Sequence, residues 1–226
     1  MRLPLHKREL TVYGRKFSFL FLALLSYLVL DPYFEGSDSN HLSFRIIGCA
    51  VTLLSVYAVA FERRLALLAL ILSAPTLAQR ILLPRADQGV FALFVTASSF
   101  AFDLTIVIAI FRRVFATKRP DSETIFGALC VYLLVGFGFA NGYYMLATIQ
   151  PGAFAFDPLA NQHPAPGRLN FIYYSFGTLT SMGAPGIMPA SQQARSLTVI
   201  EAILGVLYVA VLVARLIGMY STPSHE

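Results

Sequence analysis

The chain has 226 residues, of which 57% are hydrophobic and 13% are charged, whereas soluble globular proteins carry about 25% charged residues. This composition excludes a disordered chain, a small disulfide-stapled module and an ordinary water-soluble domain. The formal net charge is +5, but the basic residues lie between long apolar runs and not along one face, so they indicate membrane topology and no nucleic-acid partner. Cys49 and Cys130 lie inside apolar runs and are expected to be buried thiols, not a disulfide or a metal site.

Apolar runs follow one another along the chain, and a bilayer-spanning helix needs about 20 such residues. The six long runs are Phe17–Leu30, Ile46–Phe61, Leu65–Leu83, Val90–Phe111, Ile125–Ile149 and Leu197–Tyr220. The first two are short and would need flanking basic side chains that reach the membrane surface. A further run, Leu169–Met182, is too short to span and is followed by Gly-Ala-Pro-Gly. We therefore expect an all-α membrane protein with six transmembrane helices and a re-entrant loop between the last two.

The distribution of basic residues predicts the topology. With a cytoplasmic N-terminus, 12 of the 17 Lys and Arg residues lie on the inner side and 5 on the outer side, as the positive-inside rule requires. Both termini are then cytoplasmic, and the protein is expected in the cell membrane as a multi-pass protein. The segment Thr117–Ser122 interrupts the apolar pattern and predicts a boundary between a four-helix half, residues 1–116, and a second half, residues 117–226.

Known catalytic signatures are missing from the sequence. It contains no His-Glu-x-x-His, no phosphate-binding Gly-rich loop and no Gly-x-Ser-x-Gly, so we expect no enzymatic activity, no cofactor and no metal site.

The segment after the Pro-rich loop has a distinctive order of residues. Phe-Ile-Tyr-Tyr-Ser-Phe-Gly-Thr-Leu-Thr-Ser-Met-Gly-Ala-Pro-Gly-Ile-Met-Pro, residues 171–189, precedes a span that starts near Arg195 and carries Gly205. This segment resembles the pore domain of the tetrameric potassium-channel superfamily, above all its small bacterial members with extra spans before the pore. The resemblance is specific over Leu169–Tyr220 and loose over Ile125–Ile149. It implies that residues 117–226 form helix, pore loop and helix, in a homotetramer within the lipid bilayer that passes monovalent cations.

The resemblance also implies roles for individual residues. The expected ion pathway and filter are Thr180, Ser181, Met182, Gly183, Ala184, Pro185 and Gly186. The expected filter supports are Tyr173, Tyr174, Arg195 and Glu201, and the expected gating hinge is Gly205.

The outer half of this filter departs from the family pattern. Ala184, Pro185 and Gly186 stand where the family has tyrosine, a second glycine and aspartate. Because proline is fixed near φ of about −65°, Pro185 cannot take the positive φ that glycine reaches. The inner half, residues 180–183, could still present rings of carbonyl and hydroxyl groups. We therefore expect a potassium-like channel with weakened or altered selectivity.

Two other functions stay open on the sequence alone. The first is a non-conducting channel homologue that serves as a structural or regulatory membrane subunit, which Pro185 would favour. The second is a small transporter that uses Asp103, within the fourth run, as a coupling carboxylate, although transporters usually show paired broken helices. Voltage sensing is not expected, because Val90–Phe111 contains no Arg or Lys.

Both carboxylates inside apolar runs should have partners, because charges within a bilayer are costly. For Asp103 we favour a structural partner, such as a basic residue of a neighbouring span, over a proton or ion relay. Glu201 is expected to pair with Arg195 or Arg168, or to bond the backbone, and so to brace the loop from behind.

Overall fold

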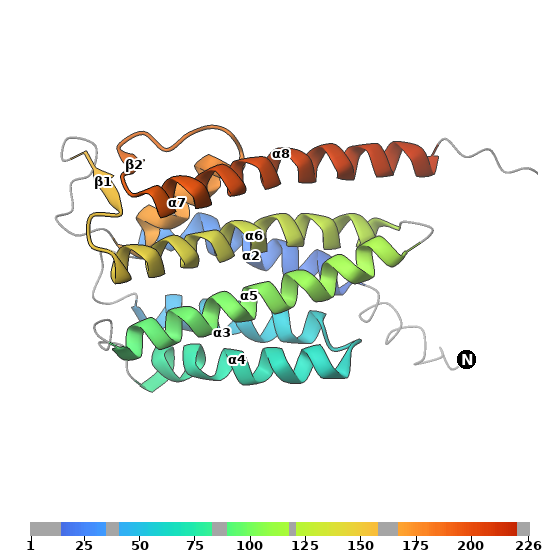
Figure 1. Ribbon diagram of the computed structural model, residues 1–226. Helices are drawn as coiled ribbons and strands as arrows, with labels where there is room; N and C mark the ends of the chain where they lie inside the picture. The colour runs from blue at the N-terminus through green and yellow to red at the C-terminus, as the bar shows by residue number, and fades with distance from the viewer. Residues whose placement is uncertain (1–14, 35–40, 83–89, 118–120, 158–166, 221–226) are drawn as a thin grey trace, which may run out of the picture.

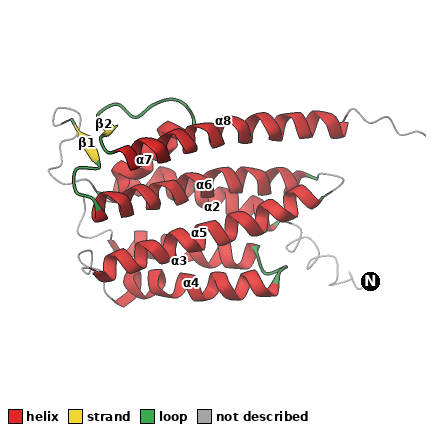
Figure 2. Cartoon of the chain, in the orientation of Figure 1, coloured by secondary structure: helices red, strands yellow, loops and turns green. Residues whose placement is uncertain are grey.

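The computed structural model describes residues 15–34, 41–82, 90–117, 121–157 and 167–220. In chain order its elements are α2 (Lys16–Phe34), α3 (His41–Ala58), α4 (Arg63–Leu82), α5 (Val90–Ala116), α6 (Ser122–Ile149), β1 (Phe154–Phe156), α7 (Arg168–Leu179), β2 (Ile187–Pro189) and α8 (Gln192–Tyr220). The long helices lie side by side as a bundle with roughly aligned axes (Figure 1). The two short strands lie together at one end of this bundle (Figure 2).

Every apolar run that the sequence shows forms a helix, to within a few residues at its ends. Four described helices are long and apolar enough to cross a membrane, over Arg63–Ile81, Val90–Ala116, Ser122–Ile149 and Gln192–Arg215. The apolar part of α3, Arg45–Ala58, is shorter than a span. The structure thus supports four of the six predicted spans, while the six-span count and the re-entrant loop stay predictions. Residues 118–120 of the predicted half boundary lie outside the described residues.

Helix α6 is the centre of the bundle and packs against α2, α5, α7 and α8. One continuous cluster of buried side chains includes Leu24 of α2, Ile106 of α5 and Val131 of α6, so it joins helices of both predicted halves. At the start of α6, Glu123 accepts hydrogen bonds from the Phe17 amide and the Ser18 hydroxyl of α2. Between membrane helices, association depends on such close packing and on interhelical hydrogen bonds.

The two strands fix the path of the chain on both sides of α7. β1 follows α6, β2 precedes α8, and the strands pair antiparallel with Phe154 opposite Pro189 and Phe156 opposite Ile187. The amide of Asp157 extends the pairing by donating to the carbonyl of Gly186 at 2.9 Å. The segment that leaves α7 is therefore held against the segment that leaves α6.

Candidate functional site

The loop after α7 folds back against the helix that it leaves. The amide of Ser181 donates to the carbonyl of Thr178 at 3.0 Å, and the amide of Gly183 donates to the carbonyl of Gly177 at 2.9 Å. A side chain at Gly177 would collide with the carbonyl of Gly183. Glycine at position 177 therefore allows the loop to lie directly on α7.

Three residues of the loop have a positive φ, which is the conformation that glycine adopts most easily. They are Ser181 at 58°, Gly183 at 82° and Gly186 at 88°. For an L-residue such as Ser181, this conformation costs about 1–2 kcal/mol. Among the described residues, Ser181 is the one non-glycine residue in this region, so the surrounding loop must hold it there.

The outer part of the loop is a tight turn. The amide of Ile187 donates to the carbonyl of Ala184 at 3.2 Å, with Pro185 and Gly186 between them. Proline at the second position and glycine with positive φ at the third are the pattern of a type II turn. In this turn the positive φ therefore lies on Gly186 and not on residue 185, where proline forbids it.

The inner part of the loop, residues 180–183, is exposed on the surface of the chain. Met182 is 68% exposed. The Thr180 hydroxyl turns back and donates to the carbonyl of Phe176 at 2.6 Å. The side chain of Thr180 is therefore engaged with α7, and the backbone of this segment is its most available polar surface.

Glu201 is buried behind α7, and its partners are not the predicted arginines. Its side chain is 0% exposed. Its two carboxyl oxygens accept hydrogen bonds from the Tyr143 hydroxyl of α6 at 2.6 Å and the Ser175 hydroxyl of α7 at 2.5 Å. Ser175 also lies 2.7 Å from the carbonyl oxygen of Gly136. The carboxyl group therefore ties α6, α7 and α8 together. Arg195 instead donates through Nε to the carbonyl of Pro189 at 3.2 Å, so it holds the strand that leaves the loop.

The two tyrosines expected to support the filter lie in different environments. The hydroxyl of Tyr174 is 2.7 Å from Thr198 Oγ1 on α8, and its ring packs edge-on against Tyr143 at 5.0 Å and Phe154 at 5.4 Å. Tyr173 is exposed. Tyr174 therefore links α7 to α6, β1 and α8 within one chain, whereas Tyr173 faces outward.

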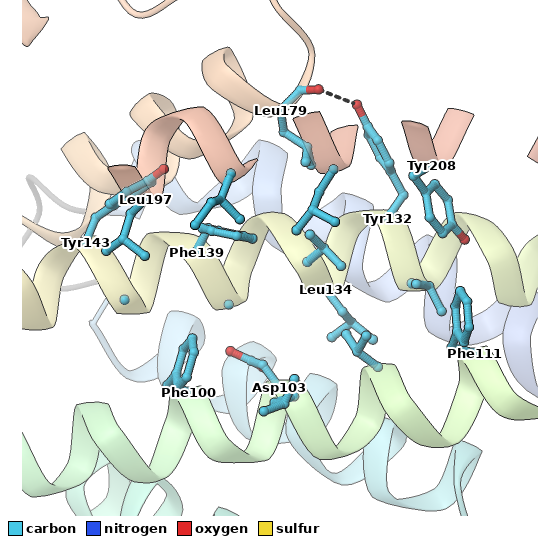
Figure 3. Close-up of a pocket in the computed structure, with 18 of the residues that line it drawn as sticks. Phe100, Asp103, Phe111, Tyr132, Leu134, Phe139, Tyr143, Leu179, Leu197 and Tyr208 are labelled. Atoms are coloured by element: carbon cyan, nitrogen blue, oxygen red, sulfur yellow. Dashed lines mark hydrogen bonds between the residues drawn. The ribbon is translucent and has the colours of Figure 1, made fainter. Parts of the chain in front are cut away.

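Gly205 supports the end of α7. A methyl group at this position would collide with the backbone carbonyl of Leu179, the last residue of α7. The Tyr132 hydroxyl of α6 donates to the same carbonyl at 3.2 Å (Figure 3). Whether Gly205 is also the gating hinge stays a prediction, but the structure gives it a packing role that requires glycine.

An apolar groove of about 750 Å³ runs along α5, α6 and α8 beside this contact (Figure 3). α8 meets the rest of the chain mainly along one line, where Glu201 and Gly205 are buried and Tyr208 is half-buried. Most of its other side chains are exposed. α8 therefore has a large apolar surface left for lipid or for another protein chain.

Three residues of the site were missed from the sequence: Tyr143, Ser175 and Gly177. Each carries a weak signal, since Ser175 and Gly177 interrupt a short apolar run and Tyr143 is a polar-tipped residue inside a span. Polar groups within a membrane need partners, and this rule could have paired Ser175 with Glu201. No cluster of His, Cys, Asp and Glu that could hold a metal ion occurs in the described part of the chain.

Comparison with known proteins finds a match in the C-terminal part of the chain. Residues 122–222 match a family model described as "Ion channel", a segment that contains α6, both strands, α7 and α8. No curated protein and no solved structure gives a significant match. The match does not favour a purely structural subunit, and this family is not a class of enzymes. Residues 122–222 are therefore similar to an ion-channel family, and the four long apolar helices are those of a multi-pass membrane protein.

Proposed function

We propose that the chain forms a homotetrameric channel for monovalent cations that discriminates weakly between potassium and sodium. The observation that carries the proposal is the turn at Ala184–Ile187, which ends the exposed inner loop after Gly183. Residues 180–183 then form a short filter, and the chain leaves the ion path at the turn.

The direction of α7 supports a cation as the permeant ion. The helix has 12 residues and its C-terminal end, at Leu179, leads directly into the loop. The C-terminal end of a helix carries a partial negative charge of about half an elementary charge. Several such ends directed at one axis would stabilise a cation beside the loop backbone.

The exposed surface of α8 supports an oligomer. One chain supplies one such loop within the matched segment, and a single loop cannot enclose an ion path. Rotational symmetry closes a ring of identical chains around an axis. Apolar residues exposed along α8 could form the contacts between subunits: Val199, Ile203, Val206, Leu207, Val213 and Ile217.

The short filter supports weak selectivity. A potassium filter replaces the hydration shell of the ion with stacked rings of backbone carbonyls. The turn removes the outer positions from such a stack, so fewer consecutive rings remain. We expect the difference in free energy between bound potassium and bound sodium to be smaller as a result.

Recording from purified protein in a planar bilayer tests this proposal, with potassium on one side and sodium on the other. A cation current with a reversal potential near zero is expected, and Pro185→Gly should move it toward the potassium equilibrium potential. The matched control is Pro151→Gly, an exposed proline outside the loop, which should leave it unchanged. A potassium-selective wild type would refute weak selectivity, and absence of current would refute conduction.

A further inference from the structure

Asp103 of α5 is buried in the bundle at 9% exposure. It points toward α6 (Figure 3), where the side-chain amide of Asn141 donates to Oδ2 at 2.7 Å. The basic groups that act on it electrostatically are Arg168 and Arg80. Its direct hydrogen-bond partner is thus an amide, and the two basic groups, Arg80 and Arg168, come from α4 and from the start of α7.

These groups meet at a polar cavity of about 60 Å³. Asp103, Asn141, Arg80 and Arg168 all line it, together with hydroxyl-bearing residues of the neighbouring helices: Tyr27, Thr52, Ser55, Thr76 and Ser99. A polar cavity inside a membrane bundle is uncommon, because charged and polar side chains there are costly unless they pair.

Arg80 is built into the wall of this cavity. Its Nη2 donates to the Tyr27 hydroxyl at 3.4 Å, and its guanidinium lies 5.7 Å from the centre of the Tyr27 ring. A side chain at Gly48 of α3 would collide with this guanidinium. Its Nη1 is buried and has no hydrogen-bond partner among the described residues. Arg80 therefore brings a positive charge into the bundle without saturating its donors.

Arg168 brings the second positive charge, and it is the first residue of α7. Its Nε is likewise buried without a hydrogen-bond partner among the described residues. The carboxylates that act on it electrostatically are Asp31 at the end of α2 and Asp103 of α5. The helix that leads into the filter thus begins with a half-buried positive charge beside this cavity.

We propose that Asp103 and Arg168 form an electrostatic latch, through which helices α2 to α5 hold the N-terminal end of α7 and so control conduction. A helix of 12 residues is about 18 Å long at 1.5 Å per residue. Its far end rests on Gly205 and Tyr132, so a shift at Arg168 tilts the helix about that support. Because residues 180–183 follow Leu179 at this support, the tilt rotates their backbone and changes the direction of their carbonyl groups. Asp103 and Arg168 act here as positioning residues.

The electrical test rests on the proposed channel function. Open probability is recorded for the wild type, Asp103→Asn, Arg168→Gln and the double variant. Each single variant should change open probability at least fivefold in the same direction, and the double variant should change it no more than the larger single effect. Arg168→Lys keeps the charge, so its open probability should stay within twofold of the wild-type value. The control Arg112→Gln removes an exposed positive charge of α5 and should change it less than twofold. Multiplicative single effects, or single effects below twofold, would overturn the latch.

A second measurement does not depend on conduction. Hydrogen–deuterium exchange of the purified full-length protein reports on amides 172–176, which are bonded within α7. Asp103→Asn should speed their exchange at least fivefold relative to the wild type, with no change in α8. Unchanged exchange in α7 overturns the latch even if the channel conducts. If Asp103→Asn speeds exchange but the wild type carries no current, the channel function is refuted and the latch stands. If Asp103→Asn speeds exchange without changing open probability, control of conduction is overturned.

Discussion

Replacing Glu201 with leucine should release α7 from α6 and α8. The carboxyl group accepts hydrogen bonds from Tyr143 at 2.6 Å and Ser175 at 2.5 Å. Glu201→Leu keeps most of the volume but leaves the Tyr143 hydroxyl, on a side chain that is 0% exposed, without its acceptor, which costs about 1–3 kcal/mol. The single proton of the Ser175 hydroxyl can go to the Gly136 carbonyl instead, so exchanging its bond to the carboxyl group for one to a carbonyl adds only about 1 kcal/mol. We expect the free energy of unfolding to fall by about 2–4 kcal/mol and conduction to fall with it.

Glu201→Gln is the discriminating comparison. Glutamine keeps an acceptor for Tyr143 and offers an amide donor to Ser175, whose single proton can then go to the Gly136 carbonyl. The loss should stay below about 1 kcal/mol. Because the chain has no tryptophan, unfolding in detergent is followed by circular dichroism. Tyr143→Phe removes the same bond from the other side, so its effect and that of Glu201→Leu should not add. The reasoning is refuted if Glu201→Leu melts and conducts like the wild type, or if the two effects add fully.

Three further substitutions give separate tests. Gly205→Ala should displace the end of α7, because the new methyl group would collide with the carbonyl of Leu179; single-channel conductance should fall, and a normal value would contradict this contact. Gly186→Ala places an L-residue at φ 88° and should cost about 1–2 kcal/mol in thermal unfolding; an unchanged melting temperature would show that the turn does not need glycine. Asp121 caps α6 by accepting from the amide of Thr124 at 2.9 Å, and Asp121→Ala should cost about 0.5–2 kcal/mol. Hydrogen bonds from Thr124 lower the pKa of Asp121. The cap therefore contributes fully to stability above the ordinary aspartate pKa, and this contribution disappears as pH falls through the lowered pKa. A pH-independent difference in stability between wild type and Asp121→Ala would contradict it.

Most of the helical fold could be predicted from apolar run length alone, because a bilayer requires every backbone polar group to bond within its own segment. The runs Val90–Phe111 and Ile125–Ile149 both became long helices, with ends extended by the polar residues that flank them. Run length was less informative for the first two runs, since both form helices but the apolar part of α3 is shorter than a span. The packing order, with α6 at the centre, could not be predicted, since all faces of these helices are apolar and periodicity does not distinguish them.

At the site, the sequence was informative where a residue restricts the backbone. Pro185 excluded a positive φ, and the structure places a turn there with the positive φ on Gly186. The partners of Glu201 were mispredicted, because charge complementarity pointed to arginine while burial favoured neutral hydroxyl donors that come from other helices. Arg168 showed the same limit: its place in the sequence, beside a Pro-rich loop, gave no sign that it enters the cavity beside Asp103.

The length of the proposed filter depends on both ends of its loop and not on Pro185 alone. One end is fixed where Leu179 rests on Gly205, and the other where Ile187 enters the sheet with β1. The turn takes up residues 184–187, so residues 180–183 are all that remains for the proposed filter. Pro185→Gly frees the φ of one residue but moves neither end, and the turn keeps its hydrogen bond and its glycine at position 186. A gain in potassium selectivity from this substitution should therefore be partial, because a longer stack of carbonyl rings would also require the sheet to release Ile187.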